Sequence, residues 1–400
     1  MANVSSSNGL EKRPKLRFPG FDEPYRAVKL GQISSLIKRN DPRSNAPIMM
    51  LSAGNGFIMQ SDKYSRDNAG QSLKKYTLLK KGELAYNHGA SKAKQFGCCY
   101  ELREEEARIP YVYHCFKVQD TEYTPYVALE LNNTKMDKQL KRLVSSSVRM
   151  DGLLNISYDE YMSVVVYLPA YAEQKHIADF LEKLDMRIAK QEQLIESLKK
   201  YKRGVLMSYF SDDNTRQWTH YSVSQIGKVI TGSTPPTNDR SNYDGDLLFC
   251  SPGDVGEKKY ISSTEKRVSP KGFALGRPLP PNAVIVTCIG LIGKLGIATT
   301  DMITNQQINA LVVSEGFDHE FIYYAFENFF PEYRSKVSMQ TLPILSKSEF
   351  EKLRIKVPVL DVQLKISSHL AAMDRKIEHT QQELNALLEQ RSGFMQQLFI

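Results

Sequence analysis

Residues 168–210 read LPAYAEQKHIADFLEKLDMRIAKQEQLIESLKKYKRGVLMSYF, and residues 357–399 read VPVLDVQLKISSHLAAMDRKIEHTQQELNALLEQRSGFMQQLF. A constant shift of 189 residues aligns these two stretches without a gap, and it places Pro169 on Pro358 and Asp185 on Asp374. Upstream, NISYDEY from Asn155 falls on ILSKSEF in the same register. A match held in one register over this length indicates an internal duplication of the chain.

Apolar residues in both copies recur with the three-, four- and seven-residue spacing of a coiled coil. They are Ile177, Leu181, Leu184, Ile188, Ile195 and Leu198 in the first copy, and Ile366, Leu370, Met373, Ile377, Leu384 and Leu387 in the second. A helix from Ala172 to Phe210 would be about 58 Å long, too long to bury this stripe on one small domain. We therefore expect the two helices to pack on each other, antiparallel, within one chain. An ordinary core helix and a coiled coil between two chains remain alternatives.

The segments before the two copies resemble each other only weakly, so the chain alternates variable and constant parts. Both variable segments mix short runs typical of strands, such as AVIVTCIG from Ala283, with short helices, such as EFIYYAFENFF from Glu320. The sequence predicts an α+β fold with a pseudo-twofold internal repeat, in which two globular α/β domains are joined by a pair of long antiparallel coiled-coil helices. The predicted ranges are 14–168 and 213–357 for the domains, and 169–212 and 358–400 for the helices.

Composition is that of a globular protein, with 41% hydrophobic and 24% charged residues. The longest nearly apolar stretch, Ala283–Gly293, is too short for a membrane span of about 20 residues. The N-terminal residues contain no apolar signal core. The five cysteines form no CxxC pair, so we expect buried thiols and neither a disulfide framework nor a metal site. Together these features predict a cytoplasmic protein with no membrane partner.

Positive charge is concentrated outside the long helices. The formal net charge is +8, of which the two helices carry +1, so the variable segments carry the remaining +7. An excess of this sign is compatible with a polyanionic partner such as nucleic acid.

Each stretch that resembles part of a nucleotide-binding or catalytic motif lacks other features of that motif. GNGFIM from Gly54 has Met59 in place of the third glycine of a dinucleotide loop, and GLIGKLG from Gly290 lacks the spacing of a phosphate loop. Asp254, Glu257 and Lys259 have nuclease-like chemistry but lie within six residues, as in a solvated loop. The sequence therefore predicts no catalytic residue, although an enzyme with an unrecognised site in the variable segments remains an alternative.

The repeated segment and the segments before it resemble a known protein family. PAYAEQKHIADFLEKLD from Pro169, followed by a helix that ends in Lys202-Arg203-Gly204, resembles the central region of specificity subunits of type I restriction–modification enzymes. RPKLRFPGFDEPYRAVKLGQI from Arg13 resembles their usual start, with Tyr25 where many carry Trp. IGKVITGSTPPTNDRSNYDGDLLFCSPGDV from Ile226 and TNQQINAL from Thr304 resemble their target recognition domains. The first variable segment departs from this pattern, with KRNDPRSNAPI in place of the Gly-Ser-Thr-Pro-Pro loop.

The resemblance implies a subunit that has no catalytic activity and binds no cofactor itself. Each target recognition domain would read one half of a split, asymmetric site on double-stranded DNA. The paired helices would set the unread spacer and dock two methyltransferase subunits, which use S-adenosylmethionine to methylate adenine at N6. Restriction subunits would add an ATP- and Mg²⁺-dependent nuclease and translocase. The alternative is a freestanding, dimeric coiled-coil regulator that binds DNA unaided.

Polar loop residues of the variable segments are the candidate DNA contacts, because such side chains read base edges or touch phosphates. The candidates are Asn87, His88, Ser91, Lys92, Lys94, Thr231, Ser233, Thr234, Arg240, Lys294, Asn305 and Gln306. Lys92 and Lys94 are expected at phosphates rather than bases. For every one of these residues the alternative is a solvated polar turn.

Overall fold

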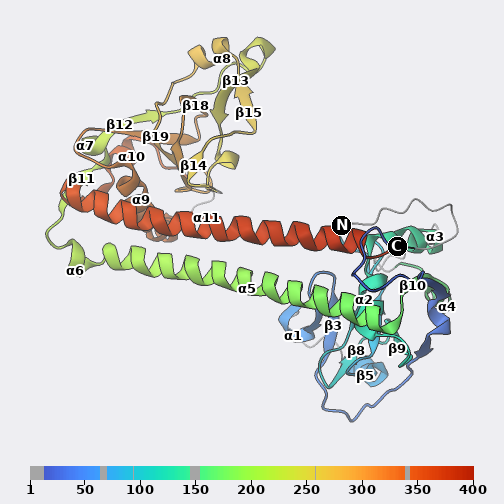
Figure 1. The fold of residues 1–400 in the computed structure, drawn as a ribbon. Coiled ribbons are helices and arrows are strands. Elements are labelled where there is room, and N and C mark those ends of the chain that lie inside the picture. The colour runs from blue at the N-terminus through green and yellow to red at the C-terminus, as the bar shows by residue number, and fades with distance from the viewer. Residues whose placement is uncertain (1–12, 64–69, 93, 145–153, 257, 338–342) are drawn as a thin grey trace. The chain divides into compact units, whose positions relative to one another are not determined.

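A computed structural model describes residues 13–63, 70–92, 94–144, 154–256, 258–337 and 343–400 (Figure 1). The chain divides into two compact units, of which the first holds Met1–Gln191 and Glu383–Ile400 and the second Glu192–Gln382. Two long helices, α5 (Tyr171–Tyr209) and α11 (Leu360–Gln397), each contribute to both units. Each unit therefore combines one globular portion with a part of α5 and a part of α11.

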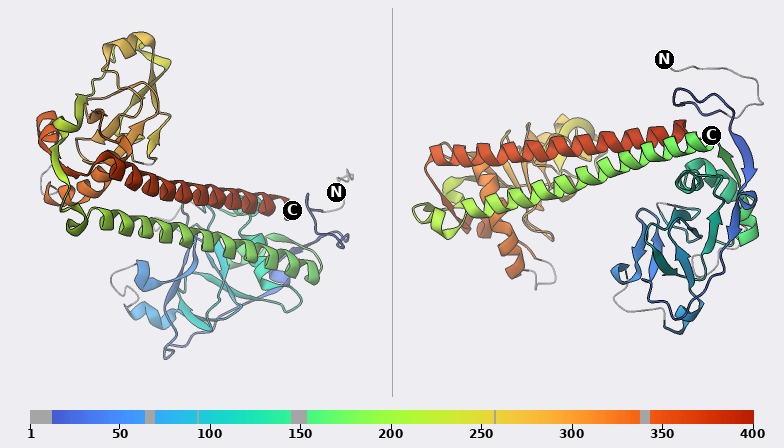
Figure 2. Two further views of the ribbon diagram at one scale, coloured as in Figure 1. Left: turned by 60° about the vertical axis from the view of Figure 1, so that its left-hand side comes forward. Right: turned by 60° about the horizontal axis from the view of Figure 1, so that its bottom comes forward.

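The helices α5 and α11 lie side by side in each unit (Figure 2). In the first unit the start of α5 meets the end of α11, where the rings of Phe180 and Phe394 pack edge to face with centroids 4.9 Å apart. In the second unit the end of α5 meets the start of α11, where Lys202 Nζ lies 2.7 Å from Asp374 Oδ1. The start of each long helix therefore packs against the end of the other. The two helices are antiparallel within one chain, as predicted.

The predicted seam positions face into these packed regions. Ile177, Leu181, Ile188, Ile195, Ile366, Leu370, Leu384 and Leu387 are buried, and Leu184, Leu198, Met373 and Ile377 are half-buried. Ile177 and Leu181 join the core of the first globular portion together with Phe399, two residues after the end of α11. In the same way Ile366 and Leu370 join the second core together with Leu206, from the end of α5. Each globular core is thus closed by the helix that follows it and by the end of the other helix.

The first globular portion is built on a four-stranded antiparallel sheet with the order β2-β9-β6-β7. Its strands are β1 (Arg26–Lys29), β2 (Ser34–Leu36), β3 (Met49–Ser52), β4 (Gly56–Met59), β5 (Thr77–Lys80), β6 (Leu84–Asn87), β7 (Cys98–Glu101), β8 (Glu106–Ile109), β9 (His114–Val118) and β10 (Val165–Leu168). Its helices are α1 (Gln60–Lys63), α2 (Thr124–Leu131), α3 (Thr134–Leu143) and α4 (Tyr158–Met162), with 3-10 turns at Leu30–Gln32 and Gly70–Lys75. Strands β1 and β10 pair antiparallel where α5 begins.

The second globular portion is built on a five-stranded sheet with the order β12-β19-β16-β17-β14, beside a three-stranded sheet β15-β13-β18. Its strands are β11 (Thr219–Ser222), β12 (Gly227–Thr231), β13 (Tyr243–Cys250), β14 (Tyr260–Ile261), β15 (Lys266–Val268), β16 (Val284–Thr287), β17 (Leu295–Ala298), β18 (Met302–Thr304), β19 (Ile308–Val313) and β20 (Arg354–Val357). Its helices are α6 (Asp212–Thr215), α7 (Val223–Ile226), α8 (Pro270–Leu275), α9 (His319–Val337) and α10 (Lys347–Lys352), with 3-10 turns at Arg240–Asn242 and Pro252–Asp254.

The two globular portions share one framework. Strands β2-β9-β6-β7 pair in the same order and direction as β12-β19-β16-β17. Helices α4 and α10 both begin with a reciprocal Ser–Glu cap, at Ser157 and at Ser346, exactly one repeat length apart in the sequence. The internal repeat and the predicted fold class are confirmed.

All five cysteines are free and buried, as expected of small apolar side chains. Burial raises the pKa of the Cys98 thiol to about 11 and that of Cys115 to about 12, which keeps both thiols protonated at neutral pH. In the described part of the chain, no helix combines the length and the apolar character needed to cross a membrane.

Candidate nucleic-acid interface

Three segments of the second unit, two of them polar, meet at the ends of strands β12, β16 and β19 of its five-stranded sheet. The hairpin between β16 and β17 contacts the turn before β19, because the Cys288 N–H donates to the Gln307 carbonyl over 2.8 Å. The segment after β12 contacts the same turn, because the Ser233 N–H donates to the Thr304 carbonyl over 2.8 Å. We call residues 231–237, 288–294 and 304–307 together the second loop cluster.

Gly232 allows this close approach of two backbone segments. A Cβ atom at Gly232 would lie 2.2 Å from the Asn305 carbonyl oxygen and 2.2 Å from Thr304 Oγ1, distances that no side chain tolerates. The glycine of the Gly-Ser-Thr-Pro-Pro motif is therefore required by packing, and it fixes the position of Ser233 and Thr234 relative to the turn before β19.

Gln306 is the exposed amide of the second loop cluster. Its Oε1 accepts a hydrogen bond of 2.6 Å from Thr234 Oγ1, which is also exposed. An amide oxygen has two lone pairs, so Gln306 keeps one acceptor position and both N–H donors. An amide held in this way is suited to bidentate contact with the major-groove edge of adenine.

Other predicted residues of this cluster stabilise its structure. Thr231 Oγ1 donates to Asn309 Oδ1 over 2.6 Å. The Asn305 side chain accepts from the Gln307 N–H, 3.1 Å away, and so shapes the turn. The backbone N–H of Lys294 donates to Thr287 Oγ1 over 3.0 Å, while its half-buried side chain lies along Gly256.

Basic side chains flank the second loop cluster. Arg240 is exposed in the 3-10 turn that follows the Gly-Ser-Thr-Pro-Pro segment. Arg277 is also exposed, and its Nη1 donates to the Thr231 carbonyl over 2.9 Å. Sequence reasoning missed Arg277, because it lies in the Gly-Arg-Pro stretch after α8, 46 residues from Thr231 along the chain.

The first unit places residues 87–94 in the equivalent connection, between β6 and β7. Here His88 is only 6% exposed, and its two ring nitrogens lie 2.7 Å from the Leu154 carbonyl and 3.0 Å from the Val112 carbonyl. Lys94 Nζ donates to the Asn132 carbonyl over 2.6 Å, and burial lowers the pKa of this lysine. In the structure these two predicted contact residues support the loop from inside.

The remaining side chains of that connection differ in their exposure. Asn87 Oδ1 accepts from the Gly89 N–H over 2.9 Å, and Ser91 Oγ accepts from the Lys94 N–H over 3.0 Å. Lys92 is exposed. Of the predicted residues in this loop, Lys92 is therefore the one that presents its charge to solvent.

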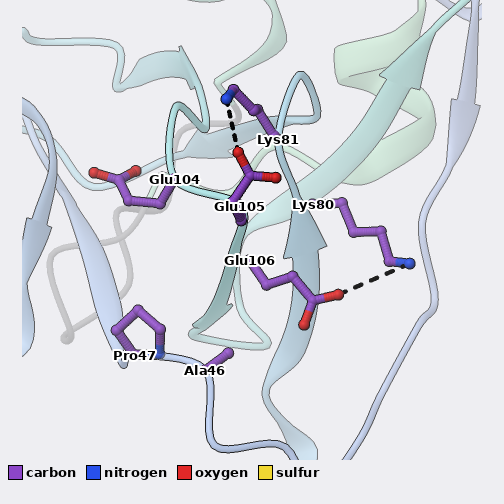
Figure 3. A pocket seen from close by; sticks show the side chains of 7 residues that line it. All are labelled: Ala46, Pro47, Lys80, Lys81, Glu104, Glu105 and Glu106. Atoms are coloured by element: carbon purple, nitrogen blue, oxygen red, sulfur yellow. Dashed lines mark hydrogen bonds and ion pairs between the residues drawn. The ribbon is translucent and has the colours of Figure 1, made fainter.

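Charge of the opposite sign gathers at another site of the first unit, a surface hollow of about 770 Å³ (Figure 3). Lys81 Nζ lies 2.7 Å from Glu105 Oε1, and Lys80 Nζ lies 3.8 Å from Glu106 Oε1. Glu104 adds a third carboxylate to the lining. Three carboxylates against two ammonium groups make this hollow unsuited to phosphates.

Asp254 and Lys259, the described residues of the nuclease-like triplet, make structural contacts. Glu257 lies outside the described residues. Asp254 Oδ2 accepts from the Ser251 N–H over 2.8 Å, and Lys259 Nζ pairs with Glu320 Oε2 over 2.7 Å. Within the described ranges, no group of three or more His, Cys, Asp or Glu is arranged to hold a metal ion.

Comparison with known sequences gives a matching family model and several relatives. Residues 215–390 match the model of the type I restriction modification DNA specificity domain. The MjaIX specificity subunit of Methanocaldococcus jannaschii, a type I restriction enzyme subunit, is 29% identical over 180 residues, which are 44% of this chain and 41% of that protein. The HindI specificity subunit of Haemophilus influenzae is 27% identical over 110 residues, 27% of this chain and 24% of that protein. The matched segments thus span less than half of either relative.

Solved structures resemble nearly the whole chain. The S subunit of a type I restriction-modification system from M. genitalium gives a TM-score of 0.62 at 14% identity, over 97% of this chain and 99% of that one. A chain from a structural study of complex assembly and conformational transition in a type I R-M system gives a TM-score of 0.58 at 15% identity, over 96% and 99%. At these identities the likeness establishes the fold.

Proposed function

We propose that the chain is a specificity subunit of a type I restriction–modification system, which its sequence and fold resemble, and that it recognises DNA for that system. In this proposal it reads a split, asymmetric site on double-stranded DNA, one half with each globular portion. One observation carries the proposal: two equal frameworks present unlike side chains in equivalent loops.

The polar and basic character of those loops supports a DNA partner. Exposed Lys92 in the first unit and exposed Arg240 and Arg277 in the second are suited to phosphates, which supply much of the affinity of such interfaces. Gln306, oriented by Thr234, is suited to a base edge. Specificity would then come from the few side chains in which the two loop sets differ.

Exposed apolar side chains on the long helices support protein partners. They include Met186, Leu194, Tyr201, Met207, Leu364 and Leu388. Apolar side chains left in water along a helix are typical docking positions for other helices. In the proposal the partners are two methyltransferase subunits, because the repeated helices offer two docking positions, and restriction subunits join the assembly.

The proposal gives this chain no catalytic step and no cofactor. Methyltransferase subunits would bind S-adenosylmethionine and methylate adenine at N6, and restriction subunits would use ATP and Mg²⁺. The role of this chain would be to bind DNA, to orient the partners, and to hold two half-sites at a fixed separation. Half-sites read from one face of B-DNA lie roughly 34 Å apart, a separation that helices of about 58 Å can set.

Coexpression with the methyltransferase subunit tests the proposal. We expect a complex of one specificity chain with two methyltransferase subunits, and N6-methyladenine in host DNA at one split, asymmetric motif. A symmetric homodimer that binds a palindrome without partners would instead favour a freestanding regulator. Turnover by the purified chain alone would favour an enzyme.

A further inference from the structure

Strand registers identify the residue of the first unit that takes the place of Gln306. Phe116 of β9 pairs with Leu84 of β6, as Leu311 of β19 pairs with Val284 of β16. Phe116 therefore corresponds to Leu311. Counting back five residues along each chain segment leads to Tyr111 in the first unit and to Gln306 in the second.

Hydrogen bonds around the two turns support this correspondence. The His88 carbonyl accepts from the Leu154 N–H over 2.9 Å, in the segment before α4, and the Cys288 carbonyl accepts from the Leu345 N–H over 2.8 Å, in the segment before α10. His88 Nε2 lies 3.0 Å from the carbonyl of Val112, the residue after Tyr111. In the second unit Cys288 makes the same connection through its backbone N–H, to the carbonyl of the residue after Gln306.

Tyr111 is an exposed aromatic residue in a basic setting. Its side chain is 53% exposed, whereas the neighbouring Tyr113 is 8% exposed. Lys75 Nζ lies 5.9 Å from the centre of the Tyr111 ring. The carbonyl of Lys74 accepts a 2.7 Å hydrogen bond from Asn40 Nδ2, in the segment that replaces the Gly-Ser-Thr-Pro-Pro loop. The turn with Tyr111, the end of the 3-10 turn and this segment thus lie together.

We propose that Tyr111 is a specificity-determining residue for the half-site that the first unit reads. Its ring packs on a base edge, where an aromatic carbon surface fits the thymine methyl group, and Lys75 contacts a neighbouring phosphate. The inference rests on the proposed function and adds to it a residue that differs in kind from its counterpart: an aromatic ring in one unit and a polar amide in the other. Two unlike side chains at one position of a shared framework give the two halves unlike sequences.

The test uses the complex of the full chain with its methyltransferase subunits, and duplexes that carry the mapped site with single base-pair changes in either half. We expect Tyr111→Ala to weaken binding to the unchanged site about tenfold, and to lower discrimination by a similar factor at one or two base pairs of one half only. Tyr111→Phe keeps the ring and should stay within about threefold of the wild type. Lys75→Gln should weaken all duplexes alike and lower the salt slope by about one.

Lys80→Gln is the matched control for Lys75, because it removes the same charge from the other end of β5, beside the acidic hollow. We expect it to leave binding and salt slope unchanged. Tyr111→Ala with wild-type discrimination in both halves would overturn the inference. So would equal losses in both halves, or a loss in Tyr111→Phe as large as that in Tyr111→Ala. A wild-type complex that binds no split site would instead overturn the proposed function itself.

Discussion

Glu130 of α2 is a buried carboxylic acid, with 3% of its surface exposed, in the core of the first unit. Its Oε1 accepts a 3.1 Å hydrogen bond from the Tyr167 N–H. Burial, the main cause, raises the pKa of Glu130 to about 7. A carboxyl whose pKa is raised on folding favours the folded state when it is protonated. Its contribution to stability is therefore present below about pH 4.5 and is lost as the pH rises to about 7.

Glu130→Gln tests this pH dependence, because it keeps the acceptor and removes the ionisation. We expect the variant to gain about 1–3 kcal/mol of local unfolding free energy over the wild type at pH 8, and little at pH 4.5. Hydrogen exchange of α2 and β10 at the two pH values measures it. In the control, Glu160→Gln, the removed carboxyl has a pKa lowered by its bonds to Ser157, so its loss should cost more at high pH. A gain in Glu130→Gln that is equal at both pH values would refute the assignment.

A second prediction at the level of single residues concerns Gln306 and the recognition of DNA. We expect Gln306→Ala to lose about 1–3 kcal/mol of discrimination at one adenine-containing base pair, in the half-site of the second unit only. Fluorescence anisotropy with a panel of single-substituted duplexes measures it. Lys92→Gln is the comparison, and it should weaken all duplexes about equally. Unchanged discrimination in Gln306→Ala would exclude the residue as a base contact.

The burial of single polar side chains could not be predicted from the sequence. His88 and Lys94 are polar loop residues by sequence, yet their side chains bond carbonyls that lie 66 and 38 positions away. Sequence reasoning missed Tyr111, because the run YVYHCFKV from Tyr111 is typical of a strand. Its exposure follows from its place in the turn before β9, which begins only at His114.

Among the elements, the long helices could be predicted because their heptad pattern is local and continuous. The helix expected over residues 172–210 is Tyr171–Tyr209 in the structure. The strands β13, β15 and β18 could not be assembled from the sequence, because short strands take their partners from tertiary packing. One of these pairings, β13 with β18, is parallel.

Lys202 of α5 links three helices of the second unit. Its side chain is 12% exposed and pairs with Asp374 of α11 over 2.7 Å and with Glu327 of α9 over 3.0 Å. The position one repeat later is Arg391, whose Nη2 donates to Asp185 Oδ2 over 3.1 Å in the first unit. The repeat therefore preserves an ion pair between the helices, but the pair of the second unit is more deeply buried.

Lys202→Met should destabilise the second unit by about 2–4 kcal/mol at pH 8, because two carboxylates lose their partner. Burial already raises the pKa of Glu327, so we expect a smaller loss at pH 5, where this carboxyl can be protonated. Fluorescence of Trp218, the single tryptophan of the chain, reports unfolding of the second unit. Arg391→Met is the matched control and should leave the Trp218 transition unchanged. A stability loss that does not depend on pH would argue against the role of Glu327.

At the scale of the whole molecule, the repeat could be found from the sequence, but the division into compact units could not. Both long helices are shared between the units, which separate at Gln191 and at Gln382. Segments nearly two hundred residues apart pack into one unit, and no linear boundary in the sequence marks such a division. The repeat nevertheless indicates how the chain is organised, because one framework is used twice with different loops.

Removal of one heptad from each helix, residues 189–195 and the equivalent 378–384, tests the spacing role. Seven helical residues span about 10 Å, or about three base pairs of B-DNA. We expect the methylated motif to keep both halves and to lose about three base pairs of spacer. Removal from α5 alone is the control and should prevent assembly, because it breaks the match between the helices. An altered half-site, or an unchanged spacer, would contradict the role of the helices.

In the proposed function the two globular portions read DNA independently of each other. The most direct measurement exchanges residues 14–168 for the same portion of another specificity subunit and maps N6-methyladenine in a host that also expresses the methyltransferase. We predict a new sequence in one half of the motif, with the other half and the spacer retained. A change in both halves, or a single continuous motif, would contradict independent reading by the two globular portions.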